Sequence, residues 1–101
     1  MTLFRRLLGD ALRAKRMERG LTLREVSAEA RVSLGYISEI ERGQKEASSE
    51  LLSSLCRALE MPLSLLLHEV SRSAAAEERL LEVSATTLPV RTETDVVASA
   101  A

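Results

Sequence analysis

The segment VSLGYISEIERG, residues 32–43, has an unusual polar face. Its isoleucines recur at helical spacing and predict a helix over 34–42, whose opposite face carries Leu34, Gly35 and Glu39. An ordinary surface helix has Lys, Glu and Gln on that face, because they favour helix and solubility. Small residues near the N-terminal end instead let a helix enter a DNA major groove. There Leu34 can contact a thymine methyl group and Glu39 can accept a hydrogen bond from cytosine.

A short turn joins this helix to the helix before it. Thr22 and Glu25 have the spacing of a capping box, which predicts a helix over 23–30. Ser33 is the expected N-cap of the 34–42 helix. Because so few residues separate the two helices, they must pack at a steep angle, as in a helix-turn-helix, with the second helix protruding from the domain.

Helical periodicity predicts three further helices around this pair and no convincing strand, so the expected fold class is all-α. One covers 3–19, one is capped by Ser48, and one begins with Pro62 at its first position. The expected organisation is a five-helix domain over 1–71, a short extra helix over 72–84 that is a candidate dimerisation element, and a flexible tail over 85–101.

Composition narrows the classes of function. The 101 residues fit one small domain, and the longest apolar stretch, MPLSLLL, is too short to span a membrane, which favours a soluble cytoplasmic protein. Residues 1–45 hold ten basic and six acidic side chains, whereas 46–101 hold four and nine, so an anionic partner suits the first half. The sequence has one cysteine and no nucleophile–base pair, metal-ligand cluster or phosphate-binding glycine loop, so we expect no enzyme, no metal and no cofactor.

The block TLREVSAEARVSLGYISEIERG resembles the helix-turn-helix core of the xenobiotic-response-element family, which includes the Cro and CI-type phage repressors. The resemblance covers about residues 5–70, and YISEIERG is its most specific part. The continuation ERGQKEASSELL is similar to the actinobacterial Clp gene regulators, which activate Clp protease genes. The resemblance implies a lambda-repressor-like five-helix domain, double-stranded DNA as partner and a role in transcription.

The resemblance also implies roles for individual residues. An Arg late in the first helix pairs in this family with a Glu near the end of the recognition helix, here Arg16 and Glu41, as a structural ion pair. The expected base contacts are Leu34, Gly35, Ser38 and Glu39. The expected phosphate contacts are Thr22, Arg24, Ser33, Tyr36, Arg42, Gln44 and Lys45. For Tyr36 the alternative is a half-buried position in the core.

Two features depart from the family pattern. Arg31 stands at the turn position where the family usually has Gly, whose backbone conformation suits that turn. Leu34 and Gly35 cannot make the bidentate contacts that read guanine or adenine. We therefore expect DNA shape to supply part of the specificity.

The fifth helix contains LSLLL, more leucine than one buried face requires. This excess predicts a symmetric homodimer that binds a palindromic operator. The expected interface residues are Leu63, Leu66, Leu67 and Val70. The alternative is that residues 74–84 cover these leucines within one chain.

The chain ends with Ala100-Ala101, which resembles the Ala-Ala degradation signals that Clp-type proteases recognise. These residues therefore suggest Clp protease as a partner, and an inert tail is the alternative.

We interpret the whole chain as a homodimeric, sequence-specific transcription regulator. The resemblance favours an activator of Clp protease and related proteolysis and stress genes, with RNA polymerase as a further partner.

Two other functions stay open. One is an antitoxin or phage-type repressor, which would bind a different operator. The other is a cofactor that bridges proteins of the transcription machinery and does not bind DNA. The second predicts no salt-sensitive affinity for DNA.

Overall fold

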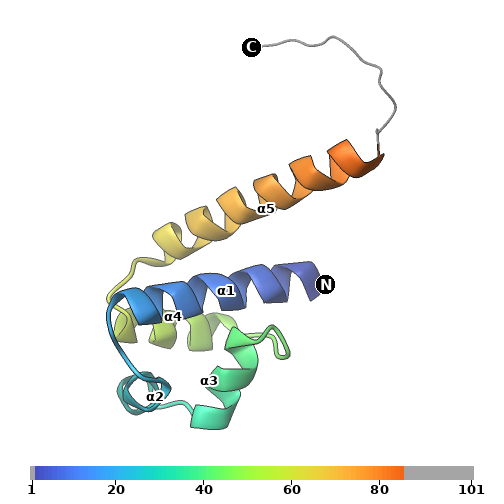
Figure 1. The fold of residues 1–101 in the computed structure, drawn as a ribbon. Coiled ribbons are helices and arrows are strands. Elements are labelled where there is room, and N and C mark those ends of the chain that lie inside the picture. Colours follow the sequence, from blue (N-terminus) through green and yellow to red (C-terminus); the bar gives the residue numbers. More distant parts are fainter. Residues whose placement is uncertain (1, 86–101) are drawn as a thin grey trace.

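Five helices make up residues 2–85, the part of the chain that the computed structural model describes (Figure 1). They are α1 (Thr2–Glu18), α2 (Leu23–Ala30), α3 (Leu34–Glu41), α4 (Ser49–Ala58) and α5 (Leu63–Ala85). No strand occurs within this range. The predicted all-α, five-helix fold class is therefore confirmed. No helix of this range is long and apolar enough to cross a membrane.

Helix α1 lies in the middle of the molecule (Figure 1). It runs antiparallel to α5 on one side, and α3 and α4 lie on its other side. Helix α2 packs against both α3 and α4. The far end of α5 extends past the start of α1 (Figure 1). This arrangement holds α3 at the edge of the domain, with one side against α1 and the other free.

All five helices contribute to one apolar core. Its fully buried side chains are Ile37, Ile40, Leu55, Leu59 and Leu66. Two of these come from α3, so the inward side of that helix is fixed and its outward side is determined with it. Cys56 belongs to the same core, and burial raises the pKa of its thiol, as expected for a small apolar core residue.

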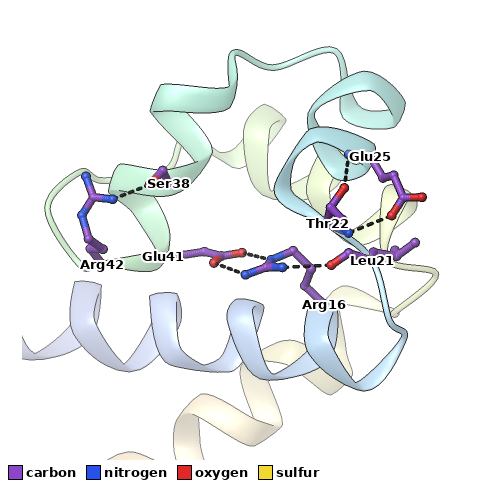
Figure 2. Close-up of polar contacts among 7 residues, drawn as sticks. All are labelled: Arg16, Leu21, Thr22, Glu25, Ser38, Glu41 and Arg42. Atoms are coloured by element: carbon purple, nitrogen blue, oxygen red, sulfur yellow. Dashed lines mark hydrogen bonds and ion pairs between the residues drawn. The ribbon is translucent and has the colours of Figure 1, made fainter.

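The predicted helix starts have the expected caps. Thr22 and Glu25 form the capping box: the Thr22 hydroxyl accepts from the Glu25 N–H at 3.0 Å, and the Glu25 carboxylate accepts from the Thr22 N–H at 2.8 Å (Figure 2). Ser33 and Ser48 each accept one backbone N–H at 3.1 Å, at the starts of α3 and α4. The caps at Thr22 and Ser33 fix where the two helices of the helix-turn-helix, α2 and α3, begin.

Helix α5 differs from the expectation in two ways. Pro62 precedes the helix instead of opening it, and its carbonyl accepts from the Leu66 N–H at 3.2 Å. The segment 72–84, expected as a separate short helix, continues α5 without a break. No glycine or proline interrupts residues 63–85, so nothing in the sequence ends the helix earlier.

The turn between α2 and α3 holds Arg31 in the left-handed conformation, with φ 61° and ψ 44°. Its N–H donates to the Ser27 carbonyl at 2.9 Å and closes α2. A side chain in this conformation is strained, because its Cβ approaches a backbone oxygen. The departure from the family's glycine thus carries a cost in stability.

Arg31→Gly is expected to raise the free energy of unfolding by about 1 kcal/mol, because glycine adopts the left-handed region without strain. Urea denaturation followed by circular dichroism measures the change. Arg13→Gly is the matched control: it lies inside α1, and it should lower the stability by about 1 kcal/mol. Destabilisation by Arg31→Gly would show that the Arg31 side chain contributes more than the strain costs.

Candidate nucleic-acid interface

The outward face of α3 carries the residues predicted to contact bases. Leu34 and Gly35 are exposed, and Ser38 and Glu39 are half-buried at its edges. An added Cβ at Gly35 would meet no atom of the protein within 4 Å. The N-terminal half of this face is therefore flat and open, a shape that suits a helix inserted into a major groove. Contact with bases stays a prediction.

Six of the seven residues predicted to contact phosphates are exposed around this face. They are Thr22, Arg24, Ser33, Arg42, Gln44 and Lys45. The hydroxyls of Thr22 and Ser33 accept backbone hydrogen bonds at the starts of α2 and α3, and each hydroxyl still has its own proton to donate. Exposed hydroxyls, helix starts and basic side chains together can bind the oxygens of a DNA backbone.

Tyr36, the seventh, is half-buried and packs against the core. Its hydroxyl donates to the Glu46 carbonyl at 3.0 Å. A phenol has one proton to donate, so a bond to phosphate would require that this bond be given up. The structure therefore gives Tyr36 a second role that the sequence did not indicate, which is to tie α3 to the loop that precedes α4.

The predicted pair between Arg16 and Glu41 is confirmed (Figure 2). The Arg16 guanidinium donates from Nε to Glu41 Oε2 at 2.8 Å and from Nη2 to Oε1 at 3.0 Å. Its Nη1 also donates to the Leu21 carbonyl at 2.9 Å. The hydrogen bond to Glu41 raises the pKa of Arg16 by more than burial lowers it. The pair thus joins the end of α1 to the end of the recognition helix.

Gly9 is a second link between α1 and α3, and it was not among the residues predicted to have a role. A Cβ at this position would lie 2.4 Å from the Ile40 carbonyl oxygen and 2.6 Å from that of Glu41. Only glycine lets the two backbones approach this closely. The available signal was a glycine in the middle of a strongly amphipathic helix, which often marks close packing.

A groove of about 660 Å³ opens between α1 and α3, beside the recognition face. Its lining residues are Arg6, Asp10, Arg13, Arg16, Leu23, Ser38, Glu41, Arg42 and Gln44. Arg6 pairs with Asp10 at 3.6 Å, and Arg16 with Glu41. The two remaining positive charges of the groove belong to Arg13 and Arg42. This surplus of positive charge suits a phosphate backbone that passes along the groove.

The four residues predicted at a dimer interface divide into two pairs. Leu66 and Val70 are buried within the chain, so their apolar surface is already used in the core. Leu63 and Leu67 are 43% and 44% exposed. Because 63–85 is one continuous helix, residues 74–84 do not fold back over Leu63 and Leu67. The alternative that residues 74–84 cover these leucines within one chain is therefore wrong. Ala100 and Ala101 lie outside the described residues.

Comparison with known proteins agrees with this geometry. A model of the helix-turn-helix family matches residues 12–66. The chain is 60% identical over 78 residues to the transcriptional regulator ClgR of Mycobacterium tuberculosis (strain H37Rv), a match that covers 77% of this chain and 70% of the relative. The match includes more than the two helices of the motif.

Two solved structures have the same fold. The crystal structure of the clp gene regulator ClgR from C. glutamicum has a TM-score of 0.67 at 51% identity and covers 69% of this chain and 91% of that chain. The restriction-modification controller protein C.AhdI from Aeromonas hydrophila has a TM-score of 0.60 at 26% identity and covers 61% of this chain and 94% of that chain. The chain therefore belongs to the Cro/CI-type helix-turn-helix family of DNA-binding transcriptional regulators, in which ClgR also falls.

Proposed function

We propose that this regulator activates Clp protease genes by binding a palindromic operator as a homodimer. The main support is the similarity to a protein described as the clp gene regulator, at 51% identity over most of its length. The open recognition face and the exposed phosphate-binding side chains are consistent with operator binding. In this proposal the regulator contacts RNA polymerase in the cytoplasm to activate transcription. Clp protease would then degrade the regulator through Ala100-Ala101, which would limit how long the genes stay active.

The proposed dimer uses the exposed leucines of α5. Leu63 and Leu67 lie one turn apart on one side of the helix, whereas Leu65, which is 38% exposed, lies on the opposite side, beside a groove that α5 forms with α1. An apolar surface of this kind on a small domain favours self-association. A two-fold axis there would present two recognition helices to successive major grooves, about 34 Å apart.

Leu67→Glu is expected to convert the dimer to a monomer, because two like charges would meet across the two-fold axis. Since Leu67 is 44% exposed within one chain, the substitution should leave the fold intact. Sedimentation velocity over a concentration series measures the mass. Leu34→Glu, on the exposed face of α3, is the control and should remain dimeric. An unchanged mass for Leu67→Glu would place any dimer contact elsewhere.

Operator binding is tested by fluorescence anisotropy with two duplexes, a palindromic Clp-promoter sequence and its scrambled counterpart, across a salt series. We expect tight binding to the promoter duplex alone, with a steep salt dependence. Arg42→Ala should make the negative slope of log K against log salt shallower by about 1.8, because the homodimer loses two phosphate contacts and each contributes about 0.9. Glu39→Ala should instead reduce the preference for the promoter duplex.

The outcomes separate the proposal from its rivals. Equal and weak binding to both duplexes would remove the Clp assignment and favour an antitoxin or phage-type repressor with another operator. Affinity that does not depend on salt would favour the protein-bridging cofactor. Transcription in vitro from the bound promoter then distinguishes activation, a higher transcript level, from repression.

A further inference from the structure

The Arg42 guanidinium is held by two uncharged partners. Its Nη1 donates to the hydroxyl of Ser38, one helical turn earlier in α3 (Figure 2). Its Nη2 donates to Oε1 of Gln44, in the following loop, at 3.3 Å. The guanidinium is therefore fixed from both sides at the C-terminal end of the recognition helix.

The charge of Arg42 is not neutralised in this arrangement. Within residues 2–85, no ion pair joins Arg42 to a carboxylate, although Glu39 and Glu46 are close to it in sequence. Arg6 and Arg16, in the same groove, are each paired with an acidic residue. An arginine that is held by neutral groups can take up a phosphate without first breaking an ion pair.

Holding the guanidinium before binding has an energetic consequence. A free arginine side chain has many rotamers, and most of that freedom is lost when it binds a phosphate. Bonds to Ser38 and Gln44 restrict the rotamers in the free protein, so less entropy remains to be lost. The gain applies to every DNA sequence, because all sequences present the same phosphates.

We propose that Ser38 is a positioning residue that orients Arg42, with the help of Gln44, for the DNA phosphate backbone. In this role Ser38 does not read a base, which revises the expectation from the family resemblance. The proposal rests on the proposed phosphate contact of Arg42. It does not depend on the identity of the operator, so it is testable on DNA of any sequence.

The test is a double-mutant cycle in DNA affinity, with Ser38→Ala, Arg42→Ala and the double variant. Anisotropy is measured on the scrambled duplex at low salt and on the Clp-promoter duplex. Ser38→Ala is expected to weaken binding to both duplexes equally, by about threefold to tenfold per subunit, which corresponds to freeing one long side chain in each subunit. In the Arg42→Ala background the same change should have no further effect.

Two controls separate positioning from a general structural role. Ser38→Thr keeps the hydroxyl and should restore most of the affinity. Ser53→Ala, on an exposed part of α4, should leave the affinity unchanged. Ser38→Ala retains every charge, so its slope of log K against log salt should equal that of the wild type. Arg42→Ala should make this negative slope shallower.

Several results would overturn the proposal. A loss of affinity for the promoter duplex alone, or an undiminished loss in the Arg42→Ala background, would make Ser38 a base-reading residue. No loss in Ser38→Ala, or none in Arg42→Ala, would remove the positioning role. Equal wild-type affinity for the two duplexes would refute only the Clp assignment, since the coupling is measured on both. A wild type that binds neither duplex would refute both proposals.

Discussion

Glu41→Ala is expected to lower the free energy of unfolding by about 3–5 kcal/mol, the loss observed when one partner of a buried ion pair is removed. The side chains of Arg16 and Glu41 are only 13% and 7% exposed. Without Glu41, the guanidinium of Arg16 would keep its charge in a site with little access to water. Urea denaturation at neutral pH, followed by circular dichroism, measures the change in unfolding free energy.

The double variant Arg16→Met/Glu41→Leu distinguishes burial of an unpaired charge from loss of a favourable pair. Apolar side chains of similar volume often replace a buried ion pair with little change in stability. We expect the double variant to be more stable than Glu41→Ala, although it leaves the Leu21 carbonyl without the Arg16 hydrogen bond. Glu39→Ala, on the outward face of α3, should change the stability by less than about 0.5 kcal/mol. Equal losses for Glu39→Ala and Glu41→Ala would contradict the structural role of the pair.

Gly9→Ala is expected to destabilise the fold by about 3 kcal/mol or more, the upper end of the cost of overpacking. The new methyl group would lie 2.4 Å from the Ile40 carbonyl oxygen, so α1 and α3 must separate. Backbone atoms cannot change rotamer to make room, unlike a flexible side chain. The melting temperature should fall in parallel with the free energy of unfolding, and both are measured on the full chain.

Gly35→Ala is the matched control, since Gly35 also lies within a helix but has no protein atom within 4 Å of an added Cβ. It should raise the stability by about 0.5–1 kcal/mol, the usual gain when alanine replaces glycine in a helix. If the backbone at Gly35 lies close to the bases in a major groove, the same variant should bind DNA more weakly although it has a higher free energy of unfolding. A Gly9→Ala variant as stable as the wild type would show that α1 does not need to approach α3 so closely.

The local features of this protein were predictable from sequence because they depend on neighbouring residues. The capping box at Thr22 and Glu25 and the N-cap at Ser33 involve atoms at most three residues apart. The periodic apolar residues of α3 identified Ile37 and Ile40 as its buried side and so determined its outward face. The pair between Arg16 and Glu41 links distant residues, and only the family resemblance predicted it.

The tertiary structure decided the features that depend on distances between elements. The packing of α5 against α1 and α4 buries Leu66 and Val70 while Leu67 stays exposed, and periodicity alone did not separate them. The need for glycine at position 9 arises from the backbone of a helix more than thirty residues away.

The sequence by itself therefore determined the helices, their caps and the outward face of α3, since these follow from short-range hydrogen bonds and helical spacing. Only the tertiary structure decided how closely α1 supports α3, and that the Tyr36 hydroxyl donates to the Glu46 carbonyl in the loop before α4. Such contacts depend on how far apart packed backbones lie and which rotamers they allow. No local pattern of residues contains that information.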